Sequence, residues 1–174
     1  MEKRLDKNVT IITGGGKGIG FGIAKAFAKE GSNLVITGRT ESRLIAAKDR
    51  LEEEYGIEVL AIVADGADEA AINNVVDQTI KKFGKITTLV NNAQVSKSGL
   101  PLVDHTREDI DLALHSGLYA AFFYMRDCYP YLKESKGSVI NFASGAGLFG
   151  KLGQSSYAAA KEGIRGLSRV AAAE

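Results

Sequence analysis

Short apolar segments alternate with longer amphipathic segments along this chain, and no other feature constrains the fold as strongly. Apolar runs of strand length occupy residues 9–12, 33–36, 59–63, 88–90 and 138–143. Between these runs, apolar residues recur at the spacing of one helix face. Strands that alternate with helices form a parallel sheet that is covered on both faces. The sequence therefore predicts one α/β domain built on a doubly wound parallel sheet.

Two of the predicted helices carry start signals. Asp68 can cap a helix that extends to Phe83, because an aspartate accepts hydrogen bonds from free N–H groups there. Thr106 with Asp109 three residues on resembles a capping box, and a long helix is expected from Thr106 to about Lys133. Further helices are expected at residues 21–29 and 41–55 and from about residue 156.

Bulk composition is that of an ordinary globular protein. The chain has 174 residues, 45% hydrophobic and 25% charged, with 22 basic against 21 acidic side chains. This near balance of charge favours neither a nucleic-acid nor a membrane partner. The only cysteine is Cys128, which excludes an intrachain disulfide and a cysteine-based metal site. The N-terminal residues 1–7 are charged and lack the apolar core of a signal peptide, so the default expectation is a cytoplasmic location.

A glycine-rich turn joins the first predicted strand to the first predicted helix. Residues 13–20 are Thr-Gly-Gly-Gly-Lys-Gly-Ile-Gly. A strand, a glycine-rich turn and a helix are the context of a dinucleotide site in a Rossmann-like sheet. The glycines let the backbone approach a pyrophosphate at the helix N-terminus. The spacing is G-x-x-x-G-x-G rather than G-x-G-x-x-G, and a turn that merely joins strand to helix is the alternative.

Tyr157 and Lys161 lie four residues apart in a predicted helix, so their side chains share one face. A free phenol has a pKa of about 10 and a free lysine one of about 10.4, so neither group alone is reactive near neutrality. A nearby ammonium stabilises the phenolate, which lowers the tyrosine pKa. Tyr157 is therefore a candidate general acid/base. The alternative is a Tyr–Lys pair on an exposed helix face.

Taken together, these residues resemble the short-chain dehydrogenase/reductase family. The resemblance rests on the turn at residues 13–20, on Asn91-Asn92-Ala93 after a later strand, on Ser144, and on Tyr157 with Lys161. Ser144 stands thirteen residues before Tyr157, the separation expected in that family. The match covers essentially the whole chain. It implies one dinucleotide-binding short-chain dehydrogenase domain over residues 1–174.

The resemblance implies hydride transfer between a nicotinamide cofactor and a secondary alcohol/ketone pair. Tyr157 would give a proton to the carbonyl oxygen or take one from the alcohol. Ser144 would polarise that oxygen, and Lys161 would lower the Tyr157 pKa and hold ribose hydroxyls. The alternative for Ser144 is a loop serine that bonds to its local backbone.

The resemblance also implies a set of cofactor-binding residues. Asn91 would tie neighbouring strands together beside the cofactor. Asp65 resembles the aspartate that bonds the adenine amino group, although Asp65-Gly66 is also an ordinary turn pair. The expected set is Gly14, Gly16, Lys17, Gly18, Ile19, Gly20, Arg39, Asp65, Asn91, Ala93, Tyr157 and Lys161.

The residues after the second predicted strand indicate the cofactor type. An acidic side chain there would bind a ribose 2′-hydroxyl and repel a 2′-phosphate, but this position aligns with Gly38. Arg39 follows it, and Lys17 adds a second cation from the first turn. Two cations suit a dianionic phosphate, so the sequence predicts NADP in preference to NAD. The alternative is that both cations are solvated surface charges.

Three departures from the family pattern bear on activity. Gln94 replaces the glycine of the family's N-N-A-G, near the nicotinamide ribose. Gly117 aligns where many members carry the asparagine of a tetrad with Ser, Tyr and Lys, and the water that this asparagine holds would need another partner. A glycine there could permit a local kink. The chain stops at Glu174 inside a predicted helix, whereas family members continue, so the C-terminal strands are expected to be missing.

Three interpretations follow. The first is an NADP-dependent oxidoreductase acting on a secondary alcohol or ketone, associating as a dimer or tetramer through its last two long helices. The second is a truncated, non-catalytic dinucleotide-binding fragment. The third is a relative of sugar-nucleotide epimerases, which also use Tyr and Lys but carry a long C-terminal substrate domain. The substrate and the direction of reaction are not predicted, because the residues that choose the substrate lie largely in the absent C-terminal region.

Overall fold

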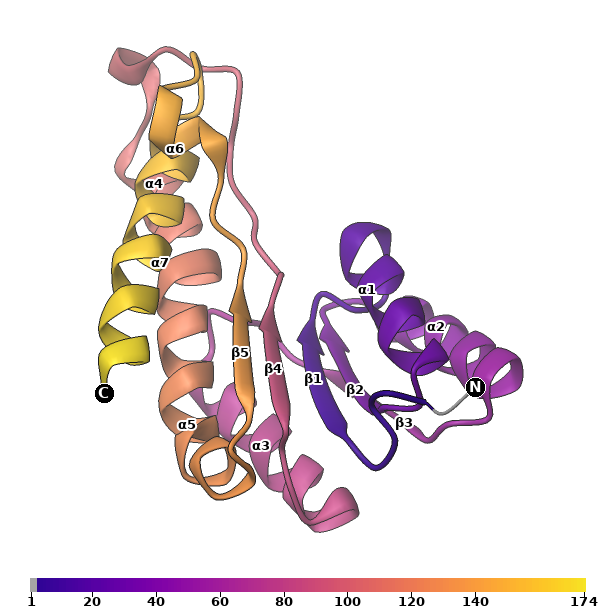
Figure 1. Ribbon diagram of the computed structural model, residues 1–174. Coiled ribbons are helices and arrows are strands. Elements are labelled where there is room, and N and C mark those ends of the chain that lie inside the picture. The colour runs from indigo at the N-terminus through magenta and orange to yellow at the C-terminus, as the bar shows by residue number, and fades with distance from the viewer. Residues whose placement is uncertain (1–2) are drawn as a thin grey trace.

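The computed structural model describes residues 3–174 and contains a five-stranded parallel sheet (Figure 1). The strands are β1 (Val9–Thr13), β2 (Asn33–Gly38), β3 (Val59–Val63), β4 (Thr88–Asn91) and β5 (Ser138–Asn141). They lie in the order β3-β2-β1-β4-β5, and every neighbouring pair is parallel. The predicted doubly wound α/β fold is therefore confirmed.

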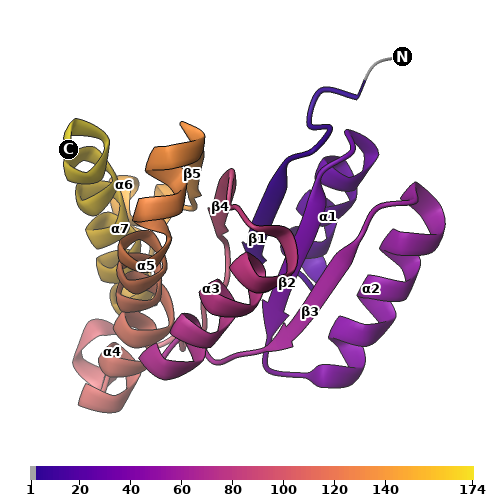
Figure 2. The ribbon, with the colours of Figure 1, turned by 90° about the horizontal axis from the view of Figure 1, so that it is seen from below.

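Helices cover both faces of the sheet. The helical elements are α1 (Gly18–Lys29), α2 (Glu41–Tyr55), α3 (Glu69–Phe83), a 3₁₀ turn η1 (Leu102–Asp104), α4 (Arg107–Ala113), a π-helical turn η2 (Leu114–Tyr119), α5 (Ala120–Ser135), α6 (Gly145–Phe149) and α7 (Ser155–Ala173). Helices α1 and α2 lie on one face, and α3 and α5 lie on the other (Figure 2). Helix α7 packs along α4 and η2.

The two apolar cores follow from the alternation of side chains along each strand. In β1, Ile11 packs toward α3 and α5, while its neighbour Ile12 packs toward α1 and α2. In β4, Leu89 and Val90 divide in the same way. All four side chains are fully buried. The central strands can be apolar throughout because both of their faces are covered.

Both predicted helix caps are present. The Asp68 carboxylate accepts hydrogen bonds from the N–H groups of Ala70 and Ala71 at 2.9 and 3.3 Å, which starts α3. Thr106 and Asp109 bond reciprocally in a capping box at the start of α4. These local signals were correct because a cap depends only on residues within one turn of each other.

The predicted long helical segment from Thr106 to about Lys133 is present, but as three consecutive helical elements rather than one regular α-helix. The π-helical turn η2 separates α4 from α5. Within it, the Ser116 Oγ lies 2.6 Å from the Leu112 carbonyl oxygen and 2.8 Å from the Val95 carbonyl oxygen. A serine hydroxyl that bonds the carbonyl four residues back competes with the helix ladder and deforms it. Elements η1 and α6 were also missed, since segments of so few residues show no periodicity.

Within residues 3–174, no helix combines the length and apolarity that a transmembrane span requires. The same residues contain no cluster of three or more His, Cys, Asp or Glu side chains that could hold a metal ion. Cys128 is fully buried in the core beside α3, and burial raises the pKa of its thiol to about 12.

Candidate active site

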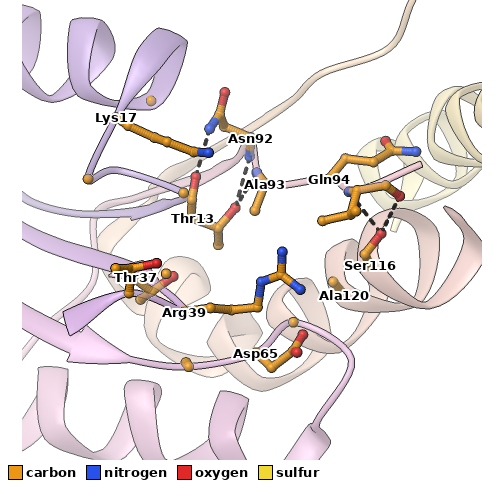
Figure 3. Close-up of a pocket in the computed structure, with 18 of the residues that line it drawn as sticks. Thr13, Lys17, Thr37, Arg39, Asp65, Asn92, Ala93, Gln94, Ser116 and Ala120 are labelled. Atoms are coloured by element: carbon orange, nitrogen blue, oxygen red, sulfur yellow. Dashed lines mark hydrogen bonds between the residues drawn. The ribbon is translucent and has the colours of Figure 1, made fainter. Parts of the chain in front are cut away.

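A cavity of about 560 Å³ opens at the carboxyl edge of the sheet, where the chain leaves β1 and β4 toward opposite faces (Figure 3). Ligands of open α/β sheets bind at such a switch point. Most of the expected cofactor residues line this cavity, namely Gly14, Gly16, Lys17, Gly18, Ile19, Gly20, Arg39, Asp65 and Ala93.

The glycine-rich turn presents bare backbone to the cavity. A Cβ atom on Gly20 would lie 2.2 Å from the Gly14 carbonyl oxygen, so the turn and the start of α1 approach too closely for any side chain there. Gly14 itself has a φ of +69°, which disfavours other residues. The first turn of α1 carries no acidic side chain. Its free N–H groups and dipole therefore form a site for an anion.

Thr13 and Asn92 clamp this turn to the end of β4. The Thr13 Oγ1 accepts hydrogen bonds from the N–H groups of Asn92 and Ala93, both at 2.9 Å (Figure 3). The Asn92 Nδ2 donates back to the Thr13 carbonyl oxygen at 2.9 Å. Both residues belong to motifs that were visible in the sequence, but only the long-range pairing of β1 with β4 reveals their joint role.

Asn91 lies behind the cavity wall rather than in it. Its Nδ2 donates to the Asn141 Oδ1 at 2.8 Å, and the Asn141 Nδ2 donates to the Ser168 Oγ at 2.8 Å. The side chain of Asn91 thus ties β4 to β5 and, through Asn141, to α7. The neighbouring Asn92 lines the large cavity instead of Asn91.

Three cations line the cavity, two of them in the segment that follows the end of β2 at Gly38 and one in the glycine-rich turn. They are Lys17, Arg39 and Arg43. Arg39 extends into the cavity toward Asp65 (Figure 3). The Asp65 carboxylate accepts a hydrogen bond from the Ala67 N–H at 3.0 Å, so it both forms a turn and faces the cavity.

Ser144 and Tyr157 line a second cavity, of about 310 Å³, together with Ser96, Lys151 and other polar residues. Ser144 is the N-cap of α6, and its Oγ accepts a hydrogen bond from the Ala146 N–H at 3.1 Å. A hydroxyl that accepts this bond still has its own hydrogen to donate. The alternative raised above, a serine bonded to local backbone, therefore does not exclude a second role.

Lys161 is buried behind Tyr157 rather than in the wall of either cavity. Its side chain is 4% exposed, and its Nζ lies 5.6 Å from the centre of the Tyr157 ring. The Nζ donates to the Phe142 carbonyl oxygen at 2.7 Å. Burial lowers the pKa of Lys161 to about 8, so the ammonium keeps its charge at neutral pH.

Sequence reasoning missed several residues of the large cavity. Thr37, Arg43, Ser116 and Tyr124 line it, and each comes from a different element or turn. Thr37 lies at the carboxyl end of β2, so its position was a usable signal. The helix residues carry no such signal, because their approach to the cavity depends on tertiary packing.

A parallel sheet with a glycine cradle at its switch point defines a dinucleotide-binding protein. The model of the family described as short chain dehydrogenase matches residues 8–174. The 12α-hydroxysteroid dehydrogenase of Clostridium sp. is 61% identical over 176 residues, covering 98% of this chain and 68% of the relative. The levodione reductase of Leifsonia aquatica is 36% identical, covering 98% of this chain and 65% of the relative. The chain belongs to the short-chain dehydrogenase/reductase family of oxidoreductases.

Solved structures agree with this assignment. An NAD⁺-bound xylitol dehydrogenase has a TM-score of 0.93 at 28% identity, covering 98% of this chain and 66% of that one. An L-sorbose reductase from Gluconobacter frateurii, complexed with NADPH and L-sorbose, has a TM-score of 0.94 at 28% identity, covering 99% and 66%. The chain thus spans about two thirds of the length of these relatives. Its neighbours include complexes with both nicotinamide cofactors.

Proposed function

We propose that this chain carries the cofactor and proton-transfer sites of an NADP(H)-dependent oxidoreductase that interconverts a secondary alcohol and a ketone. The observation that carries the proposal is the shared cavity of Ser144 and Tyr157 beside the large cavity. Val95 lines the large cavity and Ser96 the smaller one, so the two cavities adjoin at this segment, as hydride transfer between a cofactor in one and a substrate in the other requires.

The residues present fit a nicotinamide dinucleotide. The backbone of the glycine-rich turn and the N-terminus of α1 would hold the pyrophosphate. Asp65 would accept a hydrogen bond from the adenine amino group, and Tyr157, which lines the smaller cavity, would hold a ribose hydroxyl with Lys161 buried behind it. The bound cofactor supplies or accepts the hydride.

The protein's own groups would manage the proton. Tyr157 gives its phenol proton to the substrate oxygen during reduction and recovers it during oxidation. Ser144 donates its free O–H to the same oxygen. The charged Lys161, buried beside the Tyr157 ring, favours the phenolate that forms when the proton leaves.

The cations at the end of β2 favour NADP over NAD. Lys17, Arg39 and Arg43 line the cavity there, and Gly38 occupies the place where a carboxylate would repel a phosphate. Charge-assisted bonds from such groups recognise a 2′-phosphate.

We further infer that the substrate is a hydroxysteroid. The relative at 61% identity is named for that activity. In support, Leu148, Phe149 and Leu152 are largely exposed in the segment that follows Ser144. Lys151 of the same segment lines the smaller cavity. Exposed apolar side chains of this kind suit a rigid apolar ligand.

A stripe on α5 supports association with further copies of the chain. Phe122 and Tyr129, seven residues apart, are both exposed, as is Val170 on α7. Apolar side chains at this spacing lie on one helix face. Size-exclusion chromatography with light scattering should detect a dimer or tetramer, and a monomer at all concentrations would contradict association.

Turnover with a steroid substrate tests the whole proposal. NADPH oxidation is followed with a 12-oxosteroid and with a small ketone, in the wild type and in Tyr157→Phe. We expect turnover of the steroid that exceeds that of the small ketone and is lost in the variant, with cofactor affinity nearly unchanged. Cofactor binding without any turnover would instead support the non-catalytic fragment. A Tyr157→Phe variant that keeps more than about a tenth of the rate would exclude Tyr157 as the proton donor.

A further inference from the structure

The side chain of Gln94 is seated on Gly117. A Cβ atom at Gly117 would lie 2.8 Å from the Gln94 Cδ, 2.9 Å from its Oε1 and 3.0 Å from its Nε2. These nearly equal distances mean that the planar carboxamide lies flat over the glycine. Only a residue without a side chain leaves room for Gln94 in this conformation. Gln94 and Gly117, the two residues that depart from the family pattern, therefore contact each other.

The neighbours of these two residues, Val95 and Ser116, make a second contact. The Val95 N–H donates to the Ser116 Oγ at 3.0 Å, and the Ser116 Oγ lies 2.8 Å from the Val95 carbonyl oxygen (Figure 3). Two consecutive residues of η2, Ser116 and Gly117, thus hold two consecutive residues of the loop after β4. The same serine lies within the π-helical turn and bonds the carbonyl oxygen of Leu112.

The carboxamide of Gln94 is buried but unpaired. Its Nε2 and Oε1 are both inaccessible to solvent, and neither has a hydrogen-bond partner within residues 3–174. A buried amide left unpaired destabilises a fold, and interior polar groups of this kind are usually bridged by an ordered water. The side chain points away from the centre of the large cavity (Figure 3).

Behind this seat, η2 packs against the helix that carries the proton-transfer residues. A Cβ atom on Gly163 of α7 would lie 2.8 Å from a methyl group of Leu118, so the two elements are in close contact. Tyr157 and Lys161 lie on the same helix as Gly163. A displacement of η2 would therefore move α7.

We propose that Gln94 is a positioning residue: its carboxamide, seated on Gly117, binds an ordered water in the interior and holds η2 in the form that fixes α7. The kinetic part of this inference rests on the proposed function, and the structural part stands without it.

A double-mutant cycle tests the seat. In the wild-type background, Gly117→Ala should displace the carboxamide and lower the thermal midpoint of unfolding by about 2–4 °C. In the Gln94→Ala background the same change should raise the midpoint or leave it unchanged, because alanine then only adds helix propensity. Equal effects of Gly117→Ala in the two backgrounds would refute the packing of the Gln94 carboxamide on Gly117.

Gln94→Met separates the polar role from packing, since methionine keeps the volume without the amide. We expect a kcat reduced about tenfold or more, with cofactor affinity within about twofold of the wild type. Gln94→Gly combined with Gly117→Asn moves a carboxamide to the same place from the helix side and should recover most of the rate. A Gln94→Met variant with wild-type kcat would exclude the positioning role.

A high-resolution crystal structure of the wild type tests the water directly. An ordered water within about 3.5 Å of the Gln94 carboxamide is expected, and its absence would refute the hydration site. If the wild type shows no turnover, the proposed function fails, while the midpoint cycle and the crystal structure still decide the seat and its water.

Discussion

Lys161 combines burial, charge and one strong hydrogen bond. Burial lowers the pKa of Lys161, although the bond to the Phe142 carbonyl oxygen would by itself favour the ammonium. A charge kept in the interior at a net cost is typical of a functional group. The position of the buried ammonium beside the Tyr157 ring agrees with the proton-transfer role proposed for this pair.

The first prediction concerns the pH dependence of stability. The pKa of Lys161 is about 8 in the folded chain and 10.5 as a free side chain, so between these values the unfolded chain binds more protons. Stability attributable to Lys161 therefore rises with pH across this window, by at most about 1.4 kcal/mol per pH unit, and is flat below it. Urea unfolding of the wild type and Lys161→Met from pH 7 to 10.5 measures the difference, with the exposed Lys133→Met as control. A difference that falls with rising pH would contradict the prediction.

The second prediction concerns cofactor choice. Arg39→Asp should lower the affinity for NADPH about ten- to a hundredfold, the equivalent of one lost charge-assisted bond of about 1.5–3 kcal/mol. Affinity for NADH should rise or stay the same. Fluorescence titration of both cofactors measures this, and Arg169→Asp makes the same charge change at an exposed position on α7. Equal affinities of the wild type for the two cofactors would contradict the predicted preference.

At the scale of elements, the clamp between β1 and β4 determines the shape of the cofactor cavity. The Thr13 hydroxyl accepts hydrogen bonds from the N–H groups of Asn92 and Ala93, the two residues that follow β4. The start of the glycine-rich turn is therefore held to the segment after β4. The clamp crosses the sheet at its switch point.

Thr13→Val should remove this clamp while keeping the shape of the side chain. We expect the free energy of unfolding to fall by about 1–3 kcal/mol, because the N–H groups of Asn92 and Ala93 lose their acceptor. NADPH affinity should fall as well. Thr13→Ser retains the hydroxyl and should behave nearly as the wild type in denaturant unfolding. Equal losses in both variants would mean that the methyl group, not the hydroxyl, matters.

Elements whose signals are local were predictable from the sequence. The bounds of α2 match the prediction, and the caps of α3 and α4 were correct. The π-helical turn was not predicted, and the hydrogen bonds that join its Ser116 to Val95 connect residues 21 apart in the sequence, which no local pattern shows. Likewise, no local pattern could pair Gln94 with Gly117.

At the scale of the whole molecule, motif order predicted which segments meet at the carboxyl edge of the sheet. Parallel strands bring their carboxyl ends to one edge, so the glycine-rich turn and Asp65 meet in one cavity although about 50 residues separate them. Motif order could not show which residues surround Ser144 and Tyr157. Ser96 and Ser98 line the smaller cavity beside them because of the path of the loop after β4.

Cofactor binding should stabilise the folded chain as a unit. NADPH at a hundred times its dissociation constant adds about 2.7 kcal/mol, which for a chain of this size raises the melting temperature by about 5–10 °C. Differential scanning fluorimetry measures the shift, with NADH at the same concentration as the matched control. The absence of a shift with either nucleotide would contradict a dinucleotide site.

The segment of Val95 and Ser96 borders both cavities, with Val95 lining the large cavity and Ser96 the smaller one. A ligand that displaces this segment in one cavity would change the shape of the other. The two binding equilibria are then coupled, and thermodynamics makes the coupling equal in both directions. Each ligand would then affect the binding of the other through Val95, whose backbone N–H and carbonyl oxygen both bond to Ser116 of η2.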